Sequence, residues 1–274
     1  MAKAEAKKRP TKSSVVSNAR KSAPGGRRSQ QTTFIVVAVV IAIAVIVGGV
    51  IAVKRASDDK AQTAAANDAK SIAELKAGVK KIVAALPENL PASQLTADAI
   101  VVGNTSAPVT VNLWIDLQCP ACKAYETQTE ETLQNDVVAG TVVLNVHPVA
   151  ILDNMSTTNY SSRAGNAVVC GAEQGKFTAY KNALYAYQPE ENSAGLTDKK
   201  LILIGVAAGL DEDALTKCIN DSTHADWIKN STSAFTKNGF QYTPTILVNG
   251  KQMQEGTLDE LKSAISSAKA AAGK

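Results

Sequence analysis

Residues 107–122 read APVTVNLWIDLQCPAC, and this stretch decides the fold of the chain. Its central part, Val109 to Ile115, is a β-branched run of the kind that forms buried strands. Cys119 and Cys122 follow at once, and the polar, amphipathic residues after them end at Gly140, as a helix often does. The predicted order is therefore strand, cysteine pair and helix.

Further strands and helices are predicted on both sides of this stretch. Residues 100–102 and 142–146 are short β-branched runs, and residues 245–248 form another one directly behind a Thr-Pro pair. Residues 257–260 (TLDE) have the spacing of a capping box and start a last helix. The long stretch between the two halves, residues 156–238, reads as helical.

The composition supports a folded body, but the charge is unevenly distributed. Of the 274 residues, 45% are apolar and 20% charged, which excludes global disorder. Residues 1–33 hold nine lysines and arginines against one acid, a net +8, so the chain total of +4 leaves −4 for the other 241 residues. A basic tail on an acidic body gives no reason to expect nucleic-acid binding by the body.

Residues 34–53, FIVVAVVIAIAVIVGGVIAV, predict a transmembrane helix. As a helix they would extend about 30 Å, the thickness of the hydrocarbon core of a bilayer. The alternative is a cleaved signal peptide, but the run is longer than such apolar regions and no clear small-residue cleavage site follows. The positive-inside rule leaves the basic tail, residues 1–33, in the cytoplasm and places the following residues outside the membrane.

Two segments connect this span to the body, together residues 54–97. Residues 54–66 (KRASDDKAQTAAA) are small and polar, and we interpret them as a tether. After them, apolar residues at 72, 75, 79, 82 and 86 predict an amphipathic helix that ends before Pro87. This helix could dock on the body or stand as a stalk.

The four cysteines fall into two pairs with different uses. In an oxidising compartment an even number of cysteines is expected to pair. Cys119 and Cys122 are too close to close a useful loop, whereas a Cys170–Cys218 bridge would stabilise the fold by up to about 4 kcal/mol. A zinc site would need a second close pair, and c-type haem needs His at position 123, which is Lys.

The spacing of the close pair suits thiol chemistry. If the helix begins at Cys119, Pro120 occupies the first helical position, where its missing N–H costs nothing. The sulfur of Cys119 then faces the free amides and the positive end of the helix dipole, which favours its thiolate. Cys122 lies one turn deeper, so we expect Cys119 to attack and Cys122 to resolve the mixed disulfide.

These motifs, together with YTPTILVNG at 242–250, resemble a DsbA-type thiol–disulfide oxidoreductase of the thioredoxin superfamily, in particular its membrane-anchored bacterial members. The resemblance covers about residues 98–270. It implies that residues 98–274 form an α/β thioredoxin fold with the helical insertion at about 156–238, preceded by the N-terminal transmembrane helix. It also implies a cis peptide bond before Pro244, beside the cysteine pair, where the Thr243 backbone would bind a substrate strand.

The sequence departs from this family at two positions. Many relatives have His where this chain has Ala121, so we expect a less acidic Cys119 than in the most oxidising of them. Relatives often have a buried acid six residues before the first cysteine, where this chain has Leu113. Asp116 is the nearest carboxylate, and it is either a proton carrier for Cys122 or a solvated residue at the end of the strand.

The other conspicuous side chains are interpreted as structural. His147 follows a strand and has no second histidine near it in the sequence, so we expect neither a metal nor a catalytic role for it. We expect His224, Trp114 and Trp227 to be packing or surface residues. Tyr242 precedes Thr243 and is expected to border the substrate groove.

The expected function is the oxidation of cysteines in exported proteins, with no metal or organic cofactor. The resemblance implies reoxidation by a membrane partner of the DsbB or VKOR-like type. Two alternatives remain open at this point: a reductase or isomerase of the same fold, and a non-catalytic binding module in which the Cys119–Cys122 bridge is permanent.

Overall fold

The computed structural model describes residues 28–273, with side chains from Val47 onward except at positions 56, 58 and 59. The chain divides into two units, residues 1–66 and 67–274. Helix α1 (Arg28–Ala84) runs from one unit into the other. Most of the basic tail lies outside the described residues.

The segment 54–66 is part of helix α1, so its interpretation as a tether is wrong. It contains neither glycine nor proline and is rich in alanine, which has the highest helix propensity. Within the described part of the chain, no helix has both the length and the apolar character that crossing a membrane requires. Most side chains of the predicted span 34–53 lie outside the described residues, so the span stays a prediction.

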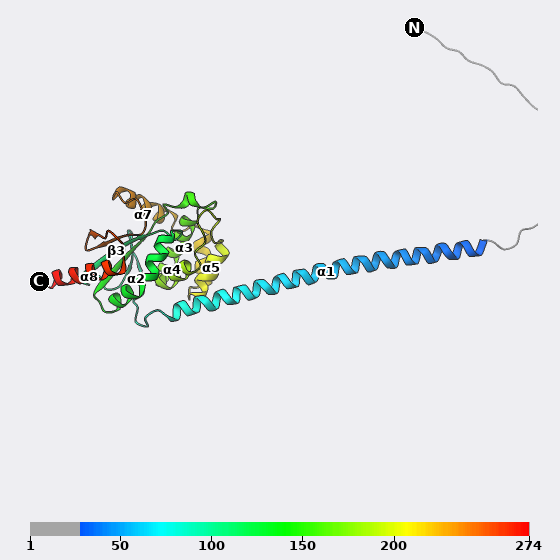
Figure 1. Ribbon diagram of the computed structural model, residues 1–274, viewed down its shortest axis with the longest axis horizontal. Coiled ribbons are helices and arrows are strands. Elements are labelled where there is room, and N and C mark those ends of the chain that lie inside the picture. Colours follow the sequence, from blue (N-terminus) through cyan, green and yellow to red (C-terminus); the bar gives the residue numbers. More distant parts are fainter. Residues whose placement is uncertain (1–27, 274) are drawn as a thin grey trace, which may run out of the picture. The chain divides into compact units, whose positions relative to one another are not determined.

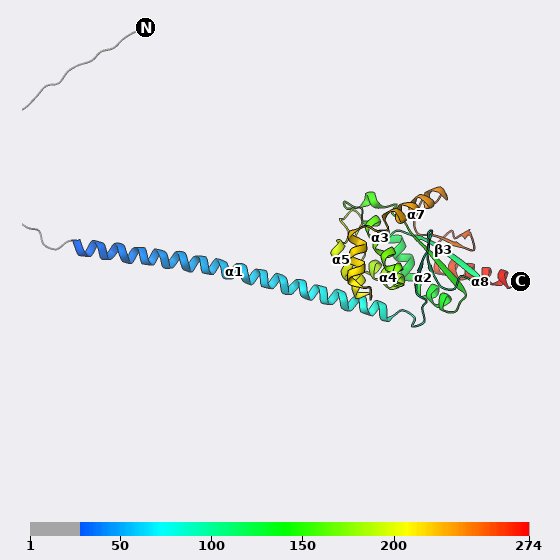
Figure 2. The ribbon, with the colours of Figure 1, turned by 180° about the vertical axis from the view of Figure 1, so that it is seen from behind.

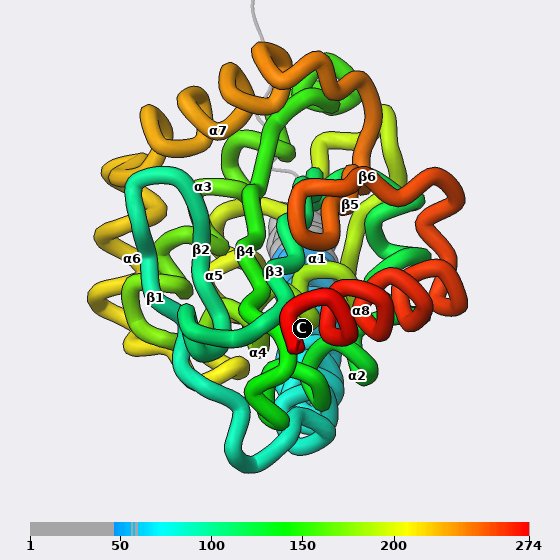
Figure 3. The backbone as a smooth tube through the Cα atoms, turned by 90° about the vertical axis from the view of Figure 1, so that its left-hand side faces the viewer, coloured from blue at the N-terminus to red at the C-terminus, as the bar shows by residue number. Residues whose placement is uncertain are grey.

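The second unit is built on one mixed sheet, in which the strands lie in the order β1-β2-β4-β3-β5-β6 (Figure 3). Strands β3 and β4 pair in parallel, and all other neighbours are antiparallel. Their bounds are β1 Gln94–Leu95, β2 Ile100–Val102, β3 Val109–Ile115, β4 Val142–Pro148, β5 Thr245–Val248 and β6 Lys251–Gln252. The four predicted strands are therefore confirmed, and the two-residue strands at the edges were not predicted.

Helices cover both faces of the sheet. Side chains on the face of Leu113 share one core with residues of α2 (Pro120–Val138) and α8 (Leu258–Ala272). On the opposite face, Trp114 packs with Val149 and with Phe235 of α7 (Ala225–Lys237). Because successive side chains of a strand point to opposite faces, neighbouring residues of β3 enter two separate clusters. This arrangement places the end of β3 and the start of α2 next to the start of β5.

Residues 156–238 are largely helical, as predicted, and most of these helices lie beside the sheet (Figure 1), whereas α7 covers one of its faces. Its helices are α3 (Tyr160–Glu173), α4 (Phe177–Ala186), α5 (Asp198–Ala207), α6 (Glu212–Asn220) and α7, with a 3-10 turn at Asp153–Met155 before them. Thr197 and Asp211 cap α5 and α6, since each side chain accepts a backbone N–H from the first turn.

The last turns of α1, which belong to the second unit, dock on this domain (Figure 2). Val79 is completely buried, and Leu75 and Val83 pack against the main core. The hydroxyl of Tyr187 donates a hydrogen bond to the carbonyl oxygen of Leu75 at 3.2 Å. Of the two interpretations of the amphipathic segment, docking on the body is confirmed.

Candidate active site

Cys119 is the N-cap residue of helix α2, and Pro120 stands at its first position, as predicted. The backbone N–H of Cys119 donates to the carbonyl oxygen of Asp116 at 3.0 Å, which closes the turn between β3 and α2. The backbone N–H of Cys122 points back at the Cys119 sulfur, 3.4 Å away. The sulfur of Cys119 therefore takes the place that a serine or aspartate oxygen occupies in an ordinary helix cap.

Thr243 and Pro244 lie against this cap, 124 residues further along the chain. The Thr243–Pro244 peptide bond is cis, as the resemblance implied. The thiol of Cys119 donates to the carbonyl oxygen of Thr243 at 3.2 Å. Tyr242 is 62% exposed, which leaves an aromatic ring in solvent next to the buried Thr243. The fold thus brings the backbone that is predicted to bind substrate into direct contact with the sulfur that is predicted to attack.

The pKa values of the two thiols are shifted in opposite directions. The hydrogen bond from the Cys122 thiol lowers the pKa of Cys119 from 9.0 to about 6 against the effect of burial, with further help from the side chain of Thr243 and the amides of Cys122 and Ala121. Burial raises the pKa of Cys122 well above its usual value. Cys119 is 6% exposed and Cys122 is fully buried. Only Cys119 is therefore a thiolate near neutral pH, which is the asymmetry that the attack and resolution roles require.

Asp116 is fully buried, so its interpretation as a solvated residue at the end of the strand is wrong. Its carboxylate accepts the backbone N–H groups of Gln118 at 2.9 Å and Leu152 at 3.0 Å. Burial raises the pKa of Asp116 from 3.8 to about 6, against these hydrogen bonds. A carboxyl group with such a pKa can hold or release a proton near neutral pH.

Leu113, at the position where relatives often have an acid, is a buried apolar residue of β3. A buried charge lies elsewhere beneath the active-site helix. The ammonium of Lys181 in α4 forms ion pairs with Glu126 and Glu130 of α2, and the side chains of Lys181 and Glu126 are 4% and 5% exposed. Burial raises the pKa of Glu126, while Lys181 counteracts it. Nothing in the local sequence indicates this cluster, because its partners are more than 50 residues apart.

A second contact that the sequence does not indicate comes from the loop after α4. The side-chain amide of Gln188 donates to the carbonyl oxygens of Leu117 and Cys119, both at 3.0 Å. The hydroxyl of Tyr185 donates to the carbonyl oxygen of Asp116 at 3.2 Å. Residues of the insertion therefore support the backbone of the cysteine turn.

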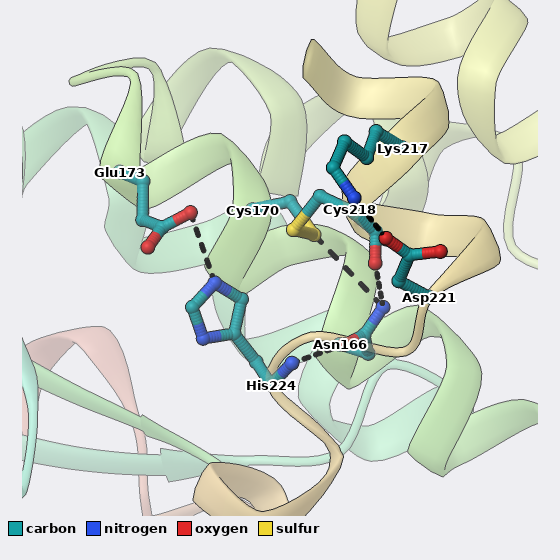
Figure 4. The surroundings of a disulfide bond; sticks show 7 residues. All are labelled: Asn166, Cys170, Glu173, Lys217, Cys218, Asp221 and His224. Atoms are coloured by element: carbon teal, nitrogen blue, oxygen red, sulfur yellow. Dashed lines mark hydrogen bonds and ion pairs between the residues drawn. A yellow bond between two sulfur atoms is a disulfide. The ribbon is translucent and has the colours of Figure 1, made fainter.

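Cys170 of α3 and Cys218 of α6 form a disulfide bond, as predicted (Figure 4). The side-chain amide of Asn166 donates to the carbonyl oxygen of Cys218, and its oxygen accepts the backbone N–H of His224. The imidazole of His224 lies 3.0 Å from the carboxylate of Glu173. The two sulfur atoms are bonded to each other, so this bridge holds α3 and α6 together.

The remaining aromatic and histidine residues pack as expected. Trp114 stacks on His147 with ring centroids 4.3 Å apart. His147 lies 2.7 Å from the carbonyl oxygen of Asp98, and burial lowers its pKa. The indole N–H of Trp227 donates to the carbonyl oxygen of Thr96. These contacts assign the three side chains to packing around the sheet.

Comparisons with known proteins agree with this geometry. The family model described as Thioredoxin matches residues 95–267. The serine/threonine-protein kinase PknE of Mycobacterium tuberculosis is 29% identical over 129 residues, but the match covers 44% of this chain and only 23% of that protein. The chain therefore spans less than a quarter of the length of this relative.

Two solved structures resemble the domain over nearly their whole length. Reduced DsbA from Mycobacterium tuberculosis is 27% identical with a TM-score of 0.54, and the match covers 64% of this chain and 99% of that one. Oxidised BdbD from Bacillus subtilis is 23% identical with a TM-score of 0.57, and the match covers 67% of this chain and 100% of that one. At this identity the likeness supports the fold alone. The chain belongs to the thioredoxin family and is a DsbA-like member of it.

Proposed function

We propose that this protein is a thiol–disulfide oxidoreductase that forms disulfide bonds in exported proteins. The observation that carries the proposal is the Cys119 thiol at the N-cap of α2, whose hydrogen bonds lower its pKa to about 6. Stabilising this thiolate stabilises the reduced dithiol relative to the disulfide. The Cys119–Cys122 disulfide is therefore a stronger oxidant than it would be if Cys119 had an ordinary pKa. This favours an oxidase over a reductase of the same fold.

The reaction consists of two exchanges. A substrate thiolate attacks the Cys119 sulfur of the oxidised protein, the Cys119–Cys122 bond breaks, and Cys122 leaves as a thiolate that takes up a proton. The second substrate thiolate then attacks the substrate sulfur that is bonded to Cys119, forms the substrate disulfide and expels Cys119 as a thiolate. The substrate dithiol loses two electrons and two protons. The protein gains both electrons and one proton, which is held by Cys122, and the other proton goes to the solvent because Cys119 stays a thiolate near neutral pH.

Each neighbouring group has a role in these steps. The backbone of Thr243, held by the cis bond to Pro244, pairs with the substrate segment beside the sulfur. The amides of Ala121 and Cys122 stabilise Cys119 as the leaving thiolate. Asp116 supplies the proton that Cys122 needs when it leaves, since its pKa of about 6 lets it carry one near neutral pH.

The proposed location follows from the N-terminal sequence. Residues 34–53 anchor the chain in the cell membrane, with the basic tail in the cytoplasm and the catalytic domain outside. In that place the domain would meet cysteine-containing proteins as they leave the export machinery. A membrane partner of the DsbB or VKOR-like type would take the two electrons from the dithiol and pass them to quinone.

The test is the oxidative refolding of a reduced, disulfide-containing protein by the oxidised full-length chain. Cys119→Ser should abolish the activity. In Cys122→Ser, offered the disulfide form of the substrate, the Cys119 thiolate should attack that disulfide, expel one substrate thiolate and remain in a mixed disulfide, because no Cys122 thiol is left to resolve it. A reduction potential near the −270 mV of thioredoxin would identify a reductase instead. An inert Cys119–Cys122 bridge that exchanges with no substrate would identify a binding module.

A further inference from the structure

The dipeptide Tyr187-Gln188, at the end of helix α4, touches two distant parts of the domain. Gln188 donates hydrogen bonds to the carbonyl oxygens of Leu117 and Cys119, both at 3.0 Å. A primary amide has two N–H donors, so a single nitrogen, Nε2, uses its full capacity on these two oxygens. Tyr187 contacts helix α1 instead.

The two carbonyl groups belong to the turn that carries the attacking sulfur. They lie on either side of Gln118, just before the first turn of α2. The carbonyl oxygen of Cys119 also accepts the first helical N–H, that of Lys123, at 3.2 Å. The side chain of Gln188 therefore fixes the peptide groups on both sides of the turn, and with them the direction in which the Cys119 sulfur faces the helix amides.

The same hydrogen bonds act on the charge of the sulfur. A carbonyl oxygen carries partial negative charge, and the carbonyl of Cys119 belongs to the residue that becomes the thiolate. The N–H groups of Gln188 place partial positive charge beside the carbonyl oxygens of Leu117 and Cys119. They therefore reduce the repulsion between these oxygens and the Cys119 thiolate. Removing these donors would also leave two half-buried acceptors without this partner.

The position of Gln188 depends in turn on Tyr187. The Tyr187 hydroxyl donates to the carbonyl oxygen of Leu75 in α1 at 3.2 Å. A Cβ atom at Gly78, one turn further along α1, would lie 2.1 Å from the same hydroxyl oxygen. Any side chain at position 78 would therefore displace the hydroxyl end of Tyr187, and Gln188 is the next residue along the chain.

We propose that Gln188 is a positioning residue for Cys119, and that the docking of helix α1 at Gly78 holds Gln188 in place through Tyr187. The inference rests on the proposed function for its biological meaning. Its direct readout is the ionisation of a thiol, which requires neither substrate nor turnover. The two can therefore fail independently of each other.

The first experiment is a titration of Cys119 in the reduced full-length chain, followed by thiolate absorbance and by the pH dependence of alkylation. Gln188→Met keeps the length and bulk of the side chain but has no N–H donor. Gln188→Ala removes the bulk as well as the donors. We expect each variant to raise the pKa of Cys119 by about one unit, a tenfold loss of acidity or about 1.4 kcal/mol.

Gln254→Ala is the matched control, because its amide also donates to a backbone carbonyl but at an exposed site near β6. The control should leave the pKa of Cys119 unchanged. If the Gln188 variants lower the thermal stability but not the acidity of Cys119, Gln188 is only structural and the proposal fails.

The second experiment tests the link to α1. Gly78→Ala should raise the pKa of Cys119 in the chain that retains Gln188 and should add nothing in the Gln188→Met background, because both changes act on the same contact. Equal effects in both backgrounds, or none in either, would refute the link. A shifted pKa in a chain that never oxidises a substrate would support this inference and overturn the proposed function.

Discussion

Asp116→Asn removes a fully buried carboxylate whose ionisation opposes folding. Its pKa is raised from 3.8 to about 6 by burial. The folded chain therefore holds this proton at pH values where the unfolded chain has lost it, and the stability that it contributes is present below pH 3.8 and lost as the pH rises through 6. The shift of about two units corresponds to about 3 kcal/mol, most of which falls between pH 4 and pH 8.

Asparagine does not titrate, so the stability difference between the variant and the parent chain should change with pH. Asparagine keeps only one acceptor oxygen for the N–H groups of Gln118 and Leu152, which costs about 1–3 kcal/mol at every pH. On top of this constant loss, the variant should gain about 2 kcal/mol relative to the parent from pH 4 to pH 8. The change with pH, and not the absolute stability, is therefore the quantity to compare.

The assay is urea unfolding at a series of pH values, with both chains carrying Cys119→Ser and Cys122→Ser. Replacing the thiols removes their own titration, which is coupled to that of Asp116. Parallel stability profiles from pH 4 to pH 8 would refute the reasoning, because they would mean that the pKa of Asp116 is the same in the folded and unfolded chains. If the variant instead lost stability relative to the parent as the pH rises, the pKa of Asp116 would be lowered by folding, which is the opposite of the predicted direction.

Two further predictions concern the insertion. Replacing Cys170 and Cys218 by alanine should lower the free energy of unfolding by up to about 4 kcal/mol, from the closed loop of 48 residues, while the alkylation rate of Cys119 stays the same; a loss of Cys119 reactivity in the folded variant would contradict a purely structural bridge. Lys181→Met leaves Glu126 and Glu130 without their cation and should cost about 3–5 kcal/mol in denaturant unfolding. The exposed Lys200→Met should change stability by less than about 0.5 kcal/mol, and an equally small effect of Lys181→Met would show that the buried pair contributes nothing.

The local part of the fold was predictable because its signals lie within a few residues of each other. The β-branched run before Cys119, the proline after it and the capping box at 257–260 each specify one element boundary. Even there the detail differs, since Glu260 accepts the N–H groups of residues 254–256 in place of that of Thr257. The polar composition of residues 54–66 predicts a tether, but their alanine content and the absence of glycine and proline favour the helix that the structure shows.

The cis peptide bond at Pro244 followed from resemblance and not from the dipeptide itself. The supports of the active site were not predictable in the same way, because they come from the insertion. Gln188 reaches the cysteine turn over 69 residues, and Lys181 reaches Glu126 over 55. The burial of Asp116 also depends on residues that are distant in the sequence. Leu152 and Tyr185 contact it from outside the strand and the helix that flank it. Contacts at such separations leave no periodic pattern in the sequence.

The pH dependence of the alkylation rate of Cys119, in the reduced chain carrying Cys122, tests the account most directly. The rate should rise with a midpoint at about pH 6 and be nearly constant from pH 7 to pH 8, because the thiolate is then almost fully formed. A midpoint near 9, the ordinary value of a cysteine, would contradict the account, since Cys119 would then have no more tendency to leave as a thiolate than any surface thiol.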